Sequence, residues 1–128
     1  MAQGGQFFTA NVGLVATGDL SSYQYYVVKH GSTAGTVKVA SAVDDAIAGI
    51  LQNEPASGEA AEVAVLGVVK AAAEASVSAG SYLTVSSTGR VKATTTDLDY
   101  TVGQALEASS SAGDIIQIVT LPGQLSDS

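Results

Sequence analysis

The stretch SAGDIIQIVTL (residues 111–121) joins a small residue, a glycine and an acid to a run of β-branched residues. Related stretches begin at ATGD (16–19), ASGE (56–59) and SAGS (78–81), each followed by an extended run. Glycine readily takes a positive φ angle, and a neighbouring Asp, Glu or Ser can accept hydrogen bonds from nearby backbone N–H groups. Each copy is therefore predicted to be a tight turn that starts a strand. The glycines at these four corners are Gly18, Gly58, Gly80 and Gly113.

Strand-forming runs recur between the turns at intervals typical of a sandwich or barrel. Aromatic and β-branched residues favour a strand in YQYYVVK (23–29), and strict alternation favours one in GTVKVA (35–40). In a third run, GEAAEVAVLGVVKA (58–71), Val63, Val65 and Val69 are separated by even numbers of residues. The remaining predicted strands are a hairpin formed by SYLTVSS and RVKATTT around Thr88 and Gly89, YTVGQALEA (100–108), and the run from Asp114, which we expect Pro122 to end because proline cannot donate to a ladder.

Two stretches fit either a helix or a strand. In AVDDAIAGILQN (42–53) the apolar residues form a helical stripe, and VVKAAAEA (68–75) is rich in alanine. We favour strands for both. The predicted fold is all-β and mainly antiparallel, a small β-barrel or sandwich with Gly-rich turns and room for one short helix. The predicted organisation is an N-terminal arm (1–12), one β domain (13–123) and a C-terminal tail (124–128).

The composition limits the classes of partner. Alanine supplies 21 of the 128 residues and aromatic residues only 5%, so the core is thin in large side chains. Charged residues, at 13%, are about half their usual share, which favours burial of surface against a partner. The net charge of −7, with five basic residues, argues against nucleic acid and against an anionic membrane surface as partners. No cysteine, signal peptide or membrane-spanning run is visible, which is consistent with folding in a reducing cytoplasm.

No combination of residues predicts catalysis, a metal site or a cofactor. His30 is the single histidine and lacks a recognisable Ser and acid to complete a triad. The close acid pairs, Asp44 with Asp45 and Asp97 with Asp99, are interpreted as loop acids because neither has the pattern of a calcium loop. Lys70 distantly suggests the modified lysine of a lipoyl or biotinyl carrier domain. Val69, however, precedes it where those motifs have Asp or Met, so Lys70 is interpreted as a strand lysine.

The segment GGQFFTANVG (4–13) is the candidate contact site. Adjacent phenylalanines on a strand face opposite ways, so at most one of Phe7 and Phe8 can enter the core. One interpretation is a first strand of the chain's own sheet. The other is an extended arm that adds to a neighbour's sheet. On the second interpretation the contact residues are Gln6, Phe7, Phe8 and Thr9.

From about Val12 to Gly123 the chain resembles the capsid decoration, or cement, proteins of tailed bacteriophages. The resemblance lies in GILQNEPASGEAAEV, VGQALEASSSAGDIIQI and the closing LPG. It implies a β-rich, non-enzymatic virion protein that binds the major capsid protein on the outer surface of the head and stabilises the shell. It also implies a homo-oligomer, a trimer at three-fold positions, made in the host bacterial cytoplasm. The alternative is a glycan-binding or adhesion β-module, for which the tyrosines at 23, 25 and 26 offer surface aromatics.

Overall fold

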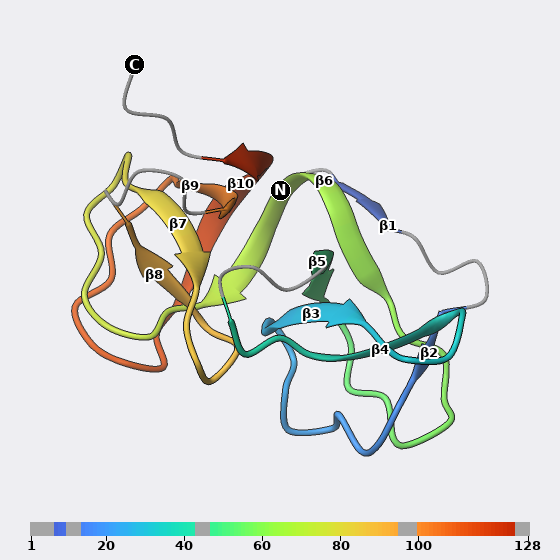
Figure 1. Ribbon diagram of the computed structural model, residues 1–128. Helices are drawn as coiled ribbons and strands as arrows, with labels where there is room; N and C mark the ends of the chain where they lie inside the picture. The colour runs from blue at the N-terminus through green and yellow to red at the C-terminus, as the bar shows by residue number, and fades with distance from the viewer. Residues whose placement is uncertain (1–6, 10–13, 43–46, 95–99, 125–128) are drawn as a thin grey trace.

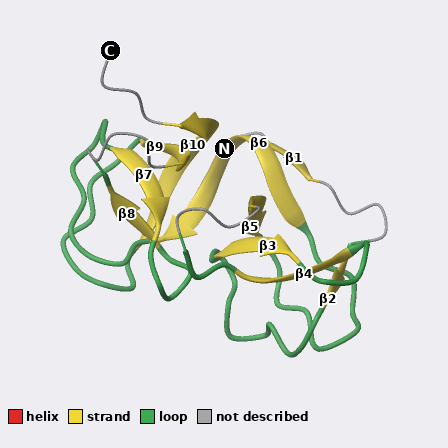
Figure 2. Cartoon of the chain, in the orientation of Figure 1, coloured by secondary structure: helices red, strands yellow, loops and turns green. Residues whose placement is uncertain are grey.

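The computed structural model describes residues 7–9, 14–42, 47–94 and 100–124 (Figure 1). These residues form strands, turns and loops but no helix, which confirms the predicted all-β class (Figure 2). The strands are β1 Phe7–Thr9, β2 Val15–Ala16, β3 Val27–His30, β4 Thr36–Val39, β5 Ile47–Leu51, β6 Val63–Ala72, β7 Tyr82–Val85, β8 Val91–Ala93, β9 Tyr100–Ala105 and β10 Ile115–Gln124.

The strands form two mainly antiparallel sheets that share β6. Sheet A contains β1 to β6, and its β2–β4 pair is parallel. Sheet B runs β6-β10-β9-β7-β8. A parallel bridge between Ala73, just after β6, and Val91 of β8 brings the two outer strands of sheet B together, so this sheet curls into a half-barrel. In Figure 1 the two sheets form two lobes, and β6 arches from one to the other.

The arch of β6 is centred on Gly67. Its φ of 116° lies in a region that side chains disfavour and glycine tolerates. Before this residue β6 pairs with β1 and β5, and after it with β10. The Gly67 N–H donates a hydrogen bond of 2.9 Å to Thr120 Oγ1 of β10. A glycine therefore lets one ten-residue strand serve both sheets.

Two apolar clusters make up the core, and sheet A separates them. Consecutive residues of its central strands alternate between the clusters, because side chains of a strand point to opposite faces. Val27 packs in the larger cluster with sheet B, and Val28 in the smaller one. Ile50 and Leu51 divide in the same way. Burial on both faces explains why each of these strands contains two consecutive apolar residues, a pattern that alternation alone does not identify.

The predicted turns are confirmed. Gly18, Gly58, Gly80 and Gly113 have φ angles between 84° and 90°. The hairpin of β7 and β8 turns at Gly89, as expected, with a φ of 87°. Residues 47–51 and 68–72 of the two ambiguous stretches lie in β5 and β6, so the strand interpretation is confirmed there; residues 73–75 lie beyond β6, and residues 43–46 lie outside the described residues.

The predicted strand at 23–29 is wrong for its first half. Residues 23–26 form turns, and β3 begins at Val27. Tyr25 has a φ of 73°, its N–H donates to Leu51 O and its carbonyl accepts the Ala72 N–H. Bonds to two distant strands thus hold the tyrosine segment in a shape that its β propensity opposes.

The prediction that Pro122 ends the last strand is also wrong. Strand β10 continues to Gln124, which pairs with Tyr100. The register against β9 shifts between Thr120 and Gly123, the interval that contains Pro122. Proline is tolerated at such an irregularity because its missing N–H is not required by the ladder.

Candidate functional site

The residues first considered for chemistry lie apart. His30 is exposed at the end of β3, opposite Val37. Asp44, Asp45, Asp97 and Asp99 lie outside the described residues. Within the described ranges no group of three or more His, Asp or Glu side chains could hold a metal ion.

Lys70 is exposed in the interior of β6, opposite Gln117 of β10. A carrier domain presents its modified lysine at a hairpin turn, whereas this lysine lies within a ten-residue strand. The position agrees with the interpretation of Lys70 as a strand lysine with a solvated head.

Glu74 holds the β7–β8 hairpin through its carboxylate. Ser86 Oγ donates to Glu74 Oε1 at 2.7 Å, Thr88 Oγ1 donates to the same oxygen, and Arg90 Nη2 lies 3.3 Å from Oε2. The hydroxyl bonds from Thr88 and Ser86, followed by the Arg90 charge, hold the pKa of Glu74 below its ordinary value. A general acid needs a raised pKa, whereas the pKa of Glu74 is lowered. The carboxylate is therefore suited to accept the hydrogen bonds that stabilise this turn.

Two further carboxylates stabilise turns in the same way. The backbone N–H groups of Ser110 and Ser111 donate to Asp114 Oδ2 at 3.0 and 3.2 Å and lower the pKa of Asp114. The Ser21 N–H donates to Asp19 Oδ1 at 3.0 Å and lowers the pKa of Asp19. Both acids belong to the recurrent turn motifs, so in these two motifs the acid stabilises the turn through backbone hydrogen bonds.

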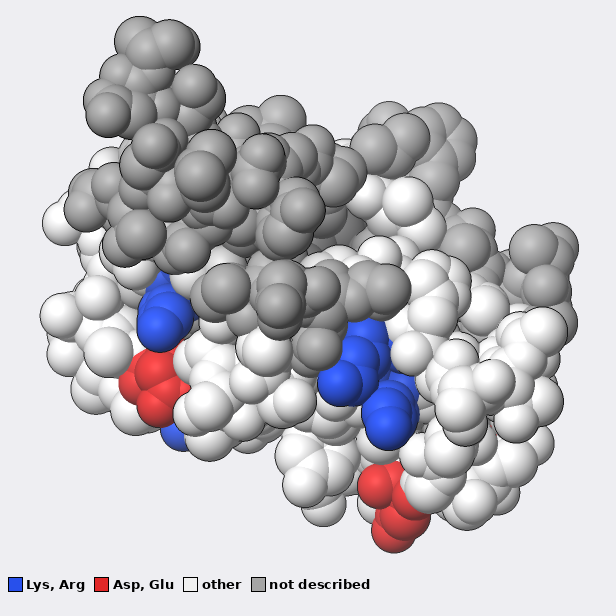
Figure 3. All heavy atoms as spheres, in the orientation of Figure 1, with Lys and Arg blue, Asp and Glu red and all other residues white. Residues whose placement is uncertain are grey.

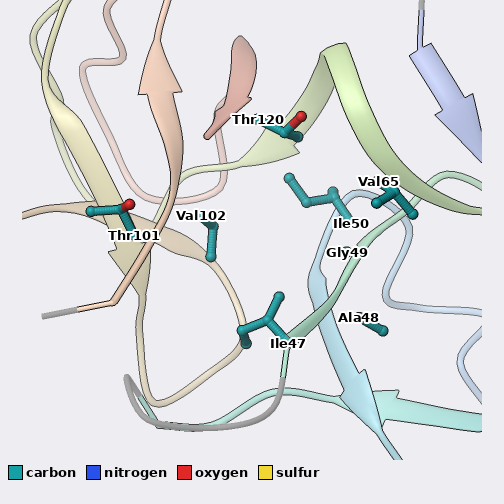
Figure 4. A pocket seen from close by; sticks show the side chains of 8 residues that line it. All are labelled: Ile47, Ala48, Gly49, Ile50, Val65, Thr101, Val102 and Thr120. Atoms are coloured by element: carbon teal, nitrogen blue, oxygen red, sulfur yellow. The ribbon is translucent and has the colours of Figure 1, made fainter. Parts of the chain in front are cut away.

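A pocket of about 210 Å³ lies between β5 of sheet A and the strands of sheet B (Figure 4). Ile47, Ile50, Val65 and Val102 supply much of its apolar wall. Its described lining includes no ionisable side chain, and its polar groups there are the hydroxyls of two threonines. The described lining of this pocket is therefore suited to apolar contact.

The proposed contact segment lies beside β6. Phe7, Phe8 and Thr9 form β1, which pairs with Gly67, Leu66 and Ala64 of the same chain; Gln6 lies outside the described residues. Ala64 also pairs with Ile50, so β1 and β5 flank β6 on its two edges. The segment therefore adds a short strand at an edge of its own sheet.

The outer face of sheet B was missed from the sequence. Inward residues such as Leu83, Ala105 and Ile118 are buried, and their neighbours point outward. One row of outward residues crosses four strands, because the register aligns Tyr82 with Gln104, Val119 and Val68. These four residues are the first row of what we call the outer face of sheet B.

The next rows of this face are formed by the ends of β9 and β10. The Leu106 N–H donates to Gln117 O at 2.9 Å, and Gln117 pairs with Lys70. Ile115, two residues before Gln117 on β10, points to the same side. Val102, Gln104 and Leu106 lie two residues apart in sequence and therefore share one side of this segment. Along that side the surface changes from pocket wall at Val102 to open surface at Leu106, which is 47% exposed.

The charged surface is sparse. On the face shown in Figure 3, the described Lys, Arg, Asp and Glu side chains form a few separate patches among uncharged residues. The Tyr23 and Tyr26 rings pack edge to face with centroids 5.1 Å apart.

No helix in the described part of the chain is long and apolar enough to cross a bilayer.

Comparison with known proteins gives one family and one described fold relative. The family model for phage cement proteins matches residues 6–121. No curated protein matches the chain. The crystal structure of the N base of the head fiber gp8.5 in bacteriophage phi29 superposes with a TM-score of 0.64 at 17% identity, covering 95% of this chain and 98% of that one. This likeness shows a shared fold.

Proposed function

Because the chain belongs to the phage cement protein family, we propose that it binds the major capsid protein on the outer surface of the phage head and stabilises the shell as a trimer. The match over residues 6–121 is the observation that carries the proposal, and a structural, capsid-associated role follows from it directly. The trimer, the outer surface and synthesis in the host cytoplasm are the finer parts of the proposal.

The surface supports a role based on contact area. Three large apolar side chains stand open on sheet B, and the chain has few charges to desolvate when it docks. Among the described residues the titratable groups with a shifted pKa are carboxylates that stabilise turns, and the described lining of the pocket is apolar apart from two threonines. These features favour a binding protein over an enzyme.

The stabilisation follows from mass action. A protein that binds the assembled shell and not its free subunits shifts the equilibrium towards the shell by its binding free energy, about 2.7 kcal/mol per site at a concentration 100 times Kd. A trimer that contacts several capsid subunits gains effective concentration for each further contact. Weak individual contacts then suffice for stable attachment.

The arm is the proposed capsid contact. Strand β1 is three residues long and lies on one edge of β6, where few backbone hydrogen bonds hold it. We place Gln6, Phe7, Phe8 and Thr9 in contact with a neighbouring subunit, either beside β6 or after release from it. Strand addition would supply backbone hydrogen bonds to such a neighbour.

The direct test is co-sedimentation of the purified chain with phage heads that lack it. We expect saturable binding and heads that resist heat or loss of divalent ions better than bare heads. Protease and antibody access on intact heads tests the outer location. Absence of binding to heads at every stage of assembly would refute the proposal.

A further inference from the structure

We propose that copies of this chain pack around a three-fold axis through the outer face of sheet B, with Lys70 of one copy beside Glu107 of the next. The inference rests on the proposed function, because that function makes the protein a trimer. It goes further by naming the surface and an ion pair that join the copies.

The first observation is the concentration of open apolar surface. Among the described residues four large apolar side chains are exposed, and Tyr82, Leu106 and Ile115 lie on this one face, each 45–47% exposed. Val68 and Val119 add half-buried apolar surface in the first row, where Gln104 lies between Val119 and Tyr82. A face with several open apolar side chains marks an interaction site more often than ordinary surface does.

The second observation is that the two end strands of sheet B are joined to each other, which disfavours contact through an edge strand. The Ala73–Val91 bridge joins the two ends of the sheet, and the Glu74 N–H donates to Val91 O at 2.7 Å. These contacts occupy backbone groups at the place where an added strand would pair. Side-chain packing across the outer face is the remaining mode of contact.

The third observation identifies the occupant through charge. A chain with a net charge of −7 repels its own copies over most of its surface. Lys70 and Glu107 both lie exposed beside this face, and their opposite charges sum to zero. Among the described residues neither forms an ion pair.

The two charges lie on opposite sides of the central strand. Lys70 is on β6 and pairs with Gln117 of β10. Glu107 follows β9, on the other side of β10, and its Oε1 accepts the Gln117 N–H at 2.9 Å. In a ring of three copies one side of each face meets the other side of the next. Each junction therefore brings a lysine to a glutamate, a complement that a second copy always supplies.

The first experiment is light scattering on the full-length protein after size exclusion. We expect the wild type at three times the chain mass of 12.7 kDa. Leu106→Asp and Ile115→Asp should associate at least tenfold more weakly, because each buries a charge in the interface. Ala34→Asp is the matched control: it adds the same charge at an exposed turn of sheet A and should remain trimeric. Trimeric Leu106→Asp and Ile115→Asp proteins would overturn the inference.

A charge exchange tests the ion pair. Lys70→Glu alone should weaken association, and Lys70→Glu combined with Glu107→Lys should restore it, with circular dichroism and thermal unfolding showing that both fold. A folded double variant that stays monomeric overturns the pairing. A wild type that is monomeric in solution also overturns the inference.

Co-sedimentation of the same proteins with heads separates this inference from the proposed function. If the wild type binds heads while the Leu106→Asp and Ile115→Asp variants stay trimeric, the face is wrong and the function stands. If the wild type forms the expected trimer, the variants break it and no form binds heads, the function is wrong and the face stands.

Discussion

Thr120 Oγ1 lies 2.9 Å from the amide nitrogen of Gly67 and 3.3 Å from its carbonyl oxygen, so one hydroxyl accepts from and donates to the residue at which β6 bends. Both residues lie where the two sheets meet, and the Thr120 side chain is 7% exposed. This pair therefore links the strand that the sheets share to the neighbouring strand of sheet B.

Thr120→Val removes that hydroxyl while keeping the shape of the side chain. It leaves the Gly67 N–H without its partner in a partly buried place, at a cost of about 1–3 kcal/mol in the free energy of unfolding. Urea denaturation followed by circular dichroism measures the loss. Thr17→Val, at an exposed position, is the control and should change stability by less than about 0.5 kcal/mol. Equal losses in the two variants would contradict this account.

Glycine substitutions should differ according to the space around each one. At Gly49 the φ is 154°, and a Cβ would lie 2.3 Å from the Ala64 carbonyl oxygen, which is backbone and cannot rotate away. Gly49→Ala should therefore cost several kcal/mol, on the order of 3 or more. Gly58→Ala meets no atom within 4 Å at a φ of 84° and should cost only the conformational penalty of about 1–2 kcal/mol. Thermal and urea unfolding compare the two, and a more damaging Gly58→Ala would refute the ranking.

Glu74 should make the hairpin of β7 and β8 sensitive to acid. Its pKa is lower in the folded chain than its ordinary value of 4.5, so its contribution to stability is present above that value and is lost as pH falls through the folded pKa. The free energy of unfolding, measured in urea from about pH 6 to about pH 3, should fall less steeply for Glu74→Gln than for the wild type. Glu62→Gln, at an exposed position, should keep the wild-type slope. Parallel curves for the wild type and Glu74→Gln would rule out this role.

Removal of residues 1–12 should separate folding from attachment. Among the described residues the two core clusters begin at Leu14 and Ala16, and the shortened chain keeps all of these, so it should still unfold cooperatively. We expect its occupancy on heads, measured by co-sedimentation, to fall at least tenfold. Full occupancy by the shortened protein would exclude the arm as the capsid contact.

Local patterns predicted the turns and strands that depend on neighbours in sequence. Gly18, Gly58, Gly80 and Gly113 were recognisable because a small residue before glycine and a polar one after it specify a turn through short-range bonds. The alternation in residues 35–40 identified β4 because Val37 and Val39 face the core while Lys38 faces out. For the candidate contact segment, the adjacent phenylalanines left open whether it would join the chain's own sheet or a neighbour's.

Patterns failed where distant strands determine the conformation. The tyrosine segment has strong strand propensity, yet Leu51 and Ala72 hold Tyr25 in a turn through backbone hydrogen bonds. Pro122 is compatible with β10 only because β9 shifts its register opposite it. The outer face of sheet B could not be predicted either. This face depends on the register that places Tyr82 beside Gln104. The number of residues between them in the sequence does not determine that register.

The sequence by itself determined an acidic, alanine- and valine-rich β domain with turns at specified glycines, because propensity, chain charge and side-chain volume are properties of residues and their immediate neighbours. The tertiary structure decided that one strand bends at Gly67 to join two sheets, and that the apolar side chains Tyr82, Leu106 and Ile115 gather on a single open face. Both results come from pairing between strands far apart in the chain, where each register is selected by the burial of the whole sheet.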